Sequence, residues 1–272
     1  MAEENCRLHI SDLSVQRGYG AFDFFRVINN IPVFMDEHID RFYRSAAGLQ
    51  LEIGMERASL RAIILELIER NNIGFSGIKL TITGGYSPDG FSMISPNFFI
   101  TQQPLLARPE HWIEQGLKVI TYEHVREQPE IKSINYITGV LLHQKLKKSG
   151  ADDFLYRQND EVSEFPRYNF FIVTDDNVIT TPSKNVLHGI TRGKVLELAA
   201  QQFAVAEKAV TMNDIKNAKE AFITSTTKQI IPIVQVDDIV IGNGKPGKIT
   251  KQLDKQLEEV IKSMVNKSFA ST

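Results

Sequence analysis

A lysine, a glutamate and a helix-opening turn follow one another from the middle of this chain onward. Lys132 stands before an apolar-striped segment, Glu164 comes at the start of a hydrophobic strand, and the turn Gly189-Ile190-Thr191 opens a further helix. Pyridoxal phosphate needs this combination. Its aldehyde forms a Schiff base with an amine, a carboxylate keeps its pyridine nitrogen protonated, and a helix start can hold its phosphate.

Neither charged residue is specific by itself. A lysine at the mouth of a cleft can lose its proton when it is desolvated and then attack an aldehyde, but most lysines sit in solvent. Beside a pyridine nitrogen, Glu164 would make the ring an electron sink, but Glu164 could also be a plain turn glutamate like Glu161. The order of the signals along the chain carries the prediction.

Three further signals suit a phosphate dianion. Free backbone N–H groups and a hydroxyl at Gly189-Ile190-Thr191 could bind it, although Thr191 could equally be an ordinary N-cap. The hydroxyl-rich turn Ser225-Thr226-Thr227 follows a strand and could close the site from another side. Arg41 could be a bidentate phosphate ligand or a surface helix arginine.

Composition excludes several classes of protein. The 31 Lys and Arg residues nearly balance the 33 Asp and Glu residues, for a net charge of −2, so nothing suggests nucleic acid or an anionic membrane as a partner. Cys6 is the only cysteine, which excludes an internal disulfide and favours a reducing compartment. No apolar run reaches the length of a membrane span, and the polar start lacks a signal-peptide core. We therefore expect a cytoplasmic protein.

Strand and helix patterns are mixed along the chain rather than grouped, which predicts a mixed α/β or α+β fold. A hairpin is expected at 20–35 around Asn29-Asn30, and the segment at 106–112 reads as a linker. We expect an N-terminal domain at 1–105 and a C-terminal domain at 113–272 that carries Lys132 and the phosphate site. The remaining expected elements are helices at 36–49, 56–71, 135–149, 191–203 and 249–265 and strands at 78–83, 97–101, 117–122, 153–157, 169–174 and 177–181.

In their order, these motifs resemble the class-IV aminotransferases, the fold-type-IV pyridoxal-phosphate enzymes. That family includes D-amino-acid transaminases, branched-chain aminotransferases and aminodeoxychorismate lyases. The resemblance covers nearly the whole chain through GYGAFDFFRV, EHIDRF, IKSINY, VSEFPRYNFFIV, LHGITR and ITSTTKQIIPI. It implies a two-domain fold with the cofactor in the cleft between the domains, and a homodimer whose partner loops reach the substrate pocket.

The resemblance also implies roles for individual residues. Lys132 corresponds to the Schiff-base lysine, which also moves the substrate α-proton, and Glu164 to the partner of the pyridine nitrogen. The cofactor-binding candidates are Arg41, Lys132, Glu164, Leu187 (an apolar side chain on the ring), Gly189, Ile190, Thr191, Ser225, Thr226 and Thr227. The substrate candidates are Phe22, Phe24, Tyr86 and Arg167. No metal ligand spacing is found among the histidines.

On the substrate side the chain departs from the family pattern. Tyr19 replaces an acidic residue, and Phe24 is bulky where small residues are common. The loop after the strand at 78–83 lacks the arginines that bind substrate carboxylates in several subfamilies, and Asp89 stands near one of their places, where it would repel a carboxylate. Arg167, in the unusual sequence Phe165-Pro166-Arg167-Tyr168, is our candidate substitute, with a solvent-facing arginine as the alternative.

Three functions remain open at this point. The first is transamination between a small amino acid and a 2-oxo acid. The second is a lyase reaction of the aminodeoxychorismate type, since glycine and aromatic residues in GGYSPDGFS are reminiscent of that subfamily, although its threonine near Asp23 or Phe24 is missing. The third is a degenerate homologue that binds the cofactor with little activity. The sequence does not fix the enantiomer or the side chain of the substrate.

Overall fold

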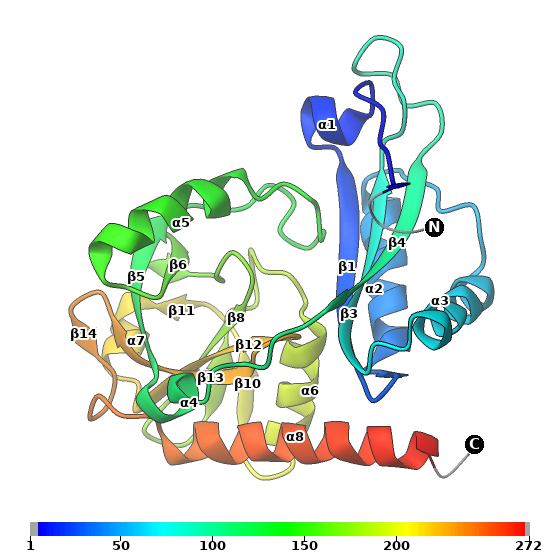
Figure 1. The fold of residues 1–272 in the computed structure, drawn as a ribbon. Coiled ribbons are helices and arrows are strands. Elements are labelled where there is room, and N and C mark those ends of the chain that lie inside the picture. Colours follow the sequence, from blue (N-terminus) through cyan, green and yellow to red (C-terminus); the bar gives the residue numbers. More distant parts are fainter. Residues whose placement is uncertain (1–4, 270–272) are drawn as a thin grey trace. The chain divides into compact units, whose positions relative to one another are not determined.

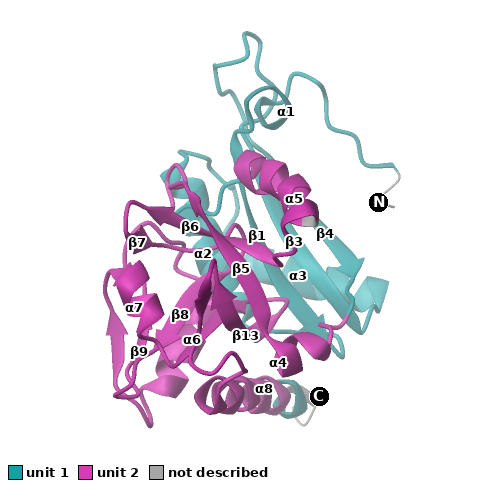
Figure 2. Cartoon of the chain, turned by 90° about the vertical axis from the view of Figure 1, so that its left-hand side faces the viewer, with its two compact units in different colours: residues 1–106, 131–135, 265–272 teal, residues 107–130, 136–264 magenta. Residues whose placement is uncertain are grey.

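A computed structural model describes residues 5–269, and these fall into two compact units. Unit 1 comprises residues 1–106, 131–135 and 265–272, and unit 2 comprises residues 107–130 and 136–264 (Figure 2). The short segment Ile131–Asn135, which carries Lys132, therefore groups with unit 1, whereas the sequence placed it in the C-terminal domain. The reason is local, because this segment pairs with a strand of unit 1 at Ala21 and Ser133.

Unit 1 is built on an antiparallel sheet of order β2-β1-β3-β4 with helices beside it (Figure 1). The predicted hairpin is confirmed: Asn29 and Asn30 both have positive φ, the backbone that a tight turn between two strands requires. The expected helix at 36–49 is confirmed as α2. The elements are α1 (Leu13–Arg17), β1 (Gly20–Ile28), β2 (Ile31–Pro32), α2 (Met35–Gly48), α3 (Arg57–Asn71), β3 (Phe75–Thr83) and β4 (Asn97–Pro104).

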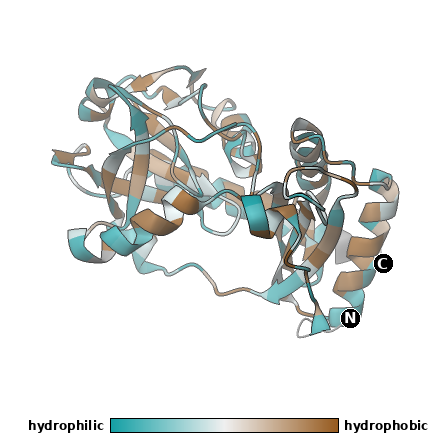
Figure 3. Cartoon of the chain, turned by 90° about the horizontal axis from the view of Figure 1, so that it is seen from above, coloured by the Kyte–Doolittle hydropathy of each residue, from teal (hydrophilic) through white to brown (hydrophobic). Residues whose placement is uncertain are grey.

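The core of unit 1 lies between α2, α3 and the sheet. Residues at helical spacing on α2, including Ile39, Phe42 and Ala46, are buried against strand residues such as Phe25 and Leu80. Burial of such side chains contributes about 1.5–3 kcal/mol each to folding. Figure 3 shows the resulting alternation of apolar and polar segments along the helices. This packing holds α2 and β1 in place, and with them the polar side chains that these two elements carry.

Unit 2 contains a ten-stranded sheet of order β10-β9-β8-β12-β13-β5-β6-β7-β11, with β14 paired to β13. In this order β12, β13 and β5 stand between β8 and β6, yet both outer strands contact Glu164. Tyr156 N–H in β6 donates to Glu164 O, and Glu164 bridges to Asn169 at the start of β8, so the sheet curls. The elements are α4 (His111–Gln115), β5 (Leu117–Glu123), α5 (Ile137–Ser149), β6 (Asp153–Gln158), β7 (Glu161–Val162), β8 (Asn169–Val173), β9 (Ile179–Thr181), α6 (Ile190–Ala199), β10 (Val205–Glu207), β11 (Val210–Thr211), α7 (Met212–Lys216), β12 (Glu220–Ser225), β13 (Gln229–Val236), β14 (Ile239–Val240) and α8 (Lys248–Phe269).

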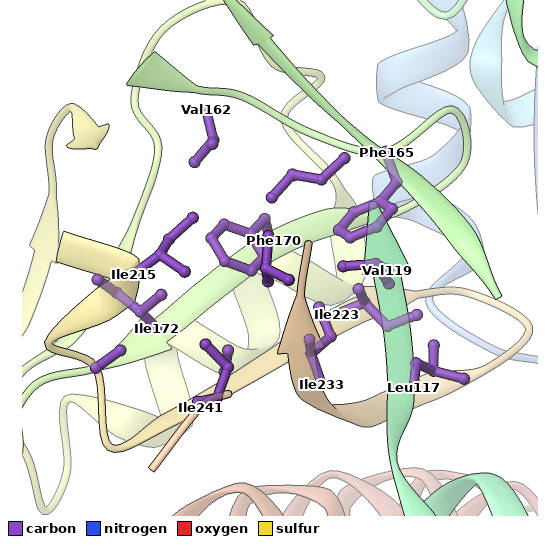
Figure 4. Packing of buried hydrophobic residues seen from close by; sticks show 14 of the residues in the cluster. Leu117, Val119, Val162, Phe165, Phe170, Ile172, Ile215, Ile223, Ile233 and Ile241 are labelled. Atoms are coloured by element: carbon purple, nitrogen blue, oxygen red, sulfur yellow. The ribbon is translucent and has the colours of Figure 1, made fainter. Parts of the chain in front are cut away.

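The curled sheet encloses its own apolar core. Figure 4 shows Phe165 and Phe170 beside Val119, Ile223 and Ile233 within this cluster. All five are almost fully buried; four of them lie on strands, whose inward face recurs with a period of two, and Phe165 lies between β7 and β8. This packed interior holds the strands, and the polar residues at the strand ends are therefore attached to a fixed backbone.

The mixed α+β fold class is confirmed, with differences in detail. The segment expected to be a linker is flanked by β4, which runs to Pro104, and by α4, which begins at His111. Helix α6 ends at Ala199, shorter than the expected 191–203. Within residues 5–269, no helix combines the length and the apolar character needed to cross a bilayer.

Candidate functional site

In unit 1, the backbone of Lys132 is held from two sides. Its carbonyl accepts a hydrogen bond from Phe22 N–H at 3.0 Å, and its N–H donates to Ser45 Oγ at 3.1 Å. Two residues further along the chain, Ile134 N–H donates to Gly20 O at 3.0 Å. These hydrogen bonds fix the point of the backbone from which the Lys132 side chain extends. Lys132 is therefore well placed, although it precedes α5 by five residues rather than directly adjoining it.

The amine of Lys132 lies beside an aromatic ring. Lys132 Nζ is 4.6 Å from the centroid of the Phe22 ring, and Phe22 is one of the expected substrate candidates. Lys79 Nζ lies 5.2 Å from the same centroid. Phe24 stands on the same face of β1, because side chains alternate along a strand, and its ring lies so close to Gly77 that a methyl group there would collide with it. Tyr86 is 47 % exposed and packs edge-on against His9.

A buried group of three polar side chains lies in the same unit. Arg41 donates from Nε and Nη2 to both oxygens of Asp23 at 2.8 Å, and His38 Nδ1 lies 2.7 Å from Asp23 Oδ1. Burial alone would raise the pKa of Asp23, but the charges and hydrogen bonds of Arg41 and His38 outweigh it and hold that pKa below its usual range. Burial lowers the pKa of His38, and the charges of Arg41 and Lys132 lower it further against the effect of Asp23.

This group gives Arg41 a partner that the sequence did not suggest. Arg41 was expected as a phosphate ligand or a surface arginine, and it is only 5 % exposed. Since Nε and Nη2 point at Asp23, Nη1 is the part of the guanidinium directed elsewhere. His38 is neutral near neutral pH, because its pKa is lowered from 6.5.

Asp89 has a structural task in the loop after β3. Its carboxylate accepts hydrogen bonds from Phe91 N–H, from Ser92 N–H and Oγ, and from Ser87 Oγ, at 2.6–3.1 Å. The hydrogen bonds from Ser92, followed by that from Phe91, lower the pKa of Asp89. The carboxylate that the sequence suggested would repel a substrate is thus bound within its own loop.

In unit 2, Glu164 is the centre of a compact polar cluster. Its Oε1 accepts from Arg126 Nε at 2.7 Å, and its Oε2 accepts from Leu187 N–H at 2.9 Å. Asn169 Nδ2 lies 3.4 Å from Oε2 and donates to Leu187 O at 2.8 Å. Glu164 is 4 % exposed, so its negative charge is matched by these donors rather than by bulk water.

Helix α6 begins next to this cluster. Its N-cap is Gly189 rather than Thr191, and no side chain caps its first amide groups. These N–H groups of Ile190 and Thr191 suit an anion. A Cβ on Gly189 would come 2.2 Å from Asn169 Oδ1, so only glycine allows this close approach. The structure thus joins Glu164, Leu187 and Gly189, three of the predicted cofactor residues, through Asn169.

The turn Ser225-Thr226-Thr227 connects β12 to β13. Ser225 Oγ accepts a hydrogen bond from Lys228 N–H at 3.1 Å, which closes the turn. Ser225 and Thr226 are half-buried and Thr227 is exposed. β12 pairs with β8 between Thr224 and Asn169, so the turn follows the same end of the sheet as the Glu164 cluster. Arg167 is exposed at the tip of the turn between Glu164 and Asn169.

Sequence reasoning missed Arg126 and Lys228. Arg126 lies in a polar loop without periodicity and offered no signal apart from its position six residues before Lys132. Lys228 follows the hydroxyl-rich turn directly, and that adjacency was the available signal. In the described part of the chain, no group of three or more His, Cys, Asp or Glu side chains could hold a metal ion.

Comparisons with known proteins agree with this geometry. Residues 20–236 match the family described as amino-transferase class IV. The chain is 32 % identical to a D-alanine aminotransferase of Bacillus licheniformis, over 98 % of this chain and 96 % of that protein. It is 31 % identical to a D-alanine aminotransferase of Listeria monocytogenes over the same shares, 98 % and 96 %. The solved structure of a branched-chain amino acid aminotransferase of Escherichia coli superposes with a TM-score of 0.88 at 23 % identity, covering 96 % of this chain and 91 % of that one.

Proposed function

Because the chain belongs to the class IV aminotransferase family, whose members depend on pyridoxal phosphate, we propose that it transfers the amino group of a small amino acid to a 2-oxo acid. When bound, pyridoxal phosphate supplies an aldehyde for amines and an electron-accepting ring. The proposal includes D-alanine-like substrates, since the D-alanine aminotransferases named above are similar along nearly their whole length. The residues of the protein position the cofactor and the substrate and supply the charges around them.

The Glu164 cluster is the observation that carries the proposal. A carboxylate whose oxygens are fixed by Arg126 and Leu187 N–H can keep a pyridine nitrogen protonated, because its own negative charge is held in place. Glu164 would thereby keep the bound ring able to accept electrons from the substrate α-carbon. An ordinary turn glutamate would need neither burial nor these donors.

We assign covalent attachment and proton transfer to Lys132. Its backbone is hydrogen-bonded on both sides, and its Nζ lies near the Phe22 ring. Lys132 would hold the cofactor aldehyde through Nζ, and the same amine could take the substrate α-proton and return it as a general base and acid. The first N–H groups of α6, with the turn Ser225-Thr226-Thr227 and Arg41, are proposed to bind the phosphate.

Substrate recognition is proposed to use Arg167 for a carboxylate. Asp89 is assigned a structural role instead, since its carboxylate accepts hydrogen bonds within the loop at 87–92. We further propose a homodimer, because α5 exposes Ile137, Val140 and Leu141 by 67 %, 65 % and 63 % and a second copy could cover them. Sedimentation of the purified protein at monomer mass would reject the dimer. A cytoplasmic location is proposed from the single cysteine.

Borohydride reduction of the cofactor-saturated protein, followed by peptide mass spectrometry, tests the assignment of Lys132. We expect a pyridoxyl adduct on Lys132, and its absence would reject the mechanism. A panel of D- and L-amino acids with a 2-oxo acid acceptor then tests the reaction by the keto acid formed. Release of p-aminobenzoate from aminodeoxychorismate would instead identify a lyase. A protein that carries the adduct and is inert to both would be the degenerate homologue.

A further inference from the structure

Lys228 is an unusual lysine, because its ammonium group lies between two aromatic rings. Its Nζ is 3.9 Å from the centroid of the Trp112 ring and 4.6 Å from that of the Tyr168 ring. Within residues 5–269, no carboxylate lies at ion-pair distance from this nitrogen. Aromatic faces stabilise a cation by roughly 0.5–2 kcal/mol but leave its hydrogen-bond donors unused. Lys228 thus retains donors for another group.

A second cation lies close by. The guanidinium carbon of Arg167 is 5.5 Å from the centroid of the same Tyr168 ring. Burial, and then the charge of Arg167, lower the pKa of Lys228 to about 8, while Asp153 and Asp152 act in the opposite direction. Two like charges in one place oppose each other, and an anion bound between them would relieve this repulsion.

A buried acidic side chain, Asp153, acts electrostatically on both cations. Asp153 is 7 % exposed, and burial raises its pKa against the effects of Phe154 N–H, Arg167, Lys228 and His143. Asp153 Oδ1 accepts from Phe154 N–H at 2.8 Å. Burial thus favours the protonated form of Asp153, whereas the two cations favour its charged form.

Tyr168 contributes a donor that has nothing to bind in the described part of the chain. Its side chain is buried, at 5 % exposure, and no acceptor there lies within hydrogen-bond reach of its hydroxyl. Burial raises the pKa of Tyr168 to about 12, so the hydroxyl stays protonated. A buried polar group without a partner costs about 1–3 kcal/mol, which a ligand oxygen could recover.

The backbone under Lys228 is fixed independently of any ligand. Arg108 Nη1 donates to Lys228 O at 3.1 Å and to Ile230 O at 3.0 Å, and Arg108 makes a bidentate ion pair with Asp254 at 2.7 Å. Arg108 and Asp254 are themselves largely buried. The position of Lys228 therefore needs little reorganisation on binding.

We propose that Lys228, Arg167 and the Tyr168 hydroxyl form a carboxylate-binding subsite for the substrate, with the ring of Trp112 as its wall. This inference rests on the proposed function and deepens it, since it adds Lys228 and Tyr168 to Arg167. The ammonium and guanidinium groups supply charge, and the hydroxyl supplies a directed donor. The ligand class is the carboxylate of an amino acid or a 2-oxo acid.

Trp112 provides the test, because it is the only tryptophan in the chain. The cofactor-saturated protein is titrated with isovalerate, which has a carboxylate and no reactive amine, and with neutral isovaleramide, while tryptophan fluorescence is followed. We expect a saturable change with isovalerate alone. Lys228→Met and Arg167→Leu should each raise its Kd about tenfold, the loss of one charge-assisted hydrogen bond. Lys228→Arg should restore most of the affinity, and Lys251→Met on α8 should change nothing.

Kinetics give a second readout. In both cation variants, KM for the amino acid should rise about tenfold while kcat stays within about threefold, as for groups that bind ground state and transition state alike. Unchanged Kd and KM in both variants would overturn the proposal. So would inorganic phosphate binding that depends on Lys228 while isovalerate binding does not, since the pair would then serve the cofactor phosphate. The borohydride adduct at Lys132 tests the proposed function separately, because isovalerate binding does not require it.

Discussion

Arg126 Nε lies 2.7 Å from Glu164 Oε1, and this ion pair is largely buried in unit 2. The opposite oxygen of Glu164 accepts from Leu187 N–H, so both sides of the carboxylate are occupied by donors. Replacing one partner of a buried pair leaves the other charge uncompensated. Because Glu164 is the proposed partner of the pyridine nitrogen, loss of this ion pair would affect both the proposed reaction and the stability of the loop that carries Arg126.

Glu164→Gln should reduce kcat about 100-fold or more, because a neutral amide no longer stabilises charge where the reaction develops it. Single-turnover rates with saturating cofactor measure this effect apart from cofactor loss. Glu161→Gln, at an exposed position of strand β7, is the matched control and should keep wild-type rates. A Glu164→Gln enzyme within threefold of wild type would contradict the assigned role.

His38 should make unit 1 less stable as the pH falls. Its folded pKa is lowered, so below its ordinary value of 6.5 the unfolded chain binds more protons than the folded chain. The contribution of His38 to stability is complete above that value and is lost progressively below it. The loss expected from Asp23, whose pKa is also lowered, falls in a separate, more acidic window below 3.8.

His38→Gln should therefore flatten the decline in the free energy of unfolding between about pH 7.5 and about pH 5.5. Urea denaturation at both pH values measures it, and exposed His111→Gln is the control. The groups that face His38 and set its behaviour are Asp23, Arg41 and Lys132. An identical decline in wild type and His38→Gln would show that His38 does not titrate in this way.

Much of the fold follows from the sequence, because its elements have strong local signals. Asn29-Asn30 predicted a hairpin through the positive φ that asparagine tolerates, and the spacing of Ile39, Phe42 and Ala46 predicted α2. Short elements such as α7 and β10 were missed, since two to five residues carry too little periodicity. The unit of Lys132 was missed because pairing with β1 across more than a hundred residues leaves no local signal.

The residues of the candidate site were likewise only partly predictable from the sequence. Lys132, Glu164 and Gly189 could be named from motif order, yet the partners that fix them are distant in sequence. Arg126 is 38 residues from Glu164, and Asp23 is 18 residues from Arg41. Lys228 meets Trp112 only because the curled sheet and α4 bring them together. Such pairings depend on tertiary packing, which a single sequence does not specify residue by residue.

Asp254→Ala should destabilise unit 2 by about 3–5 kcal/mol, because it leaves the largely buried Arg108 guanidinium without its carboxylate. Chemical denaturation measures the loss. Glu259→Ala removes the exposed pair with Lys255 on the same helix and should cost less than about 1 kcal/mol. Equal effects of the two substitutions would mean that burial does not distinguish these ion pairs.

The last prediction concerns two glycines in and before α6. A Cβ at Gly189 would lie 2.2 Å from Asn169 Oδ1, so Gly189→Ala must displace either the helix start or the amide that contacts Glu164. At Gly193 nothing lies within 4 Å of the added atom, and Gly193→Ala should stabilise the helix by about 0.5–1 kcal/mol. We expect Gly189→Ala to weaken pyridoxal phosphate binding about tenfold, the loss of one charge-assisted hydrogen bond to the anion.

Pyridoxal without the phosphate separates the two causes of weaker binding. If Gly189 matters for the first amides of α6, Gly189→Ala should lower affinity for pyridoxal phosphate far more than for pyridoxal, because only the former presents a dianion to those N–H groups. Equal losses for both compounds would place the damage at Asn169 and Glu164 instead, on the ring side. Gly193→Ala should change neither affinity, and a loss there would mean that rigidity of the helix, rather than the approach at Gly189, controls binding.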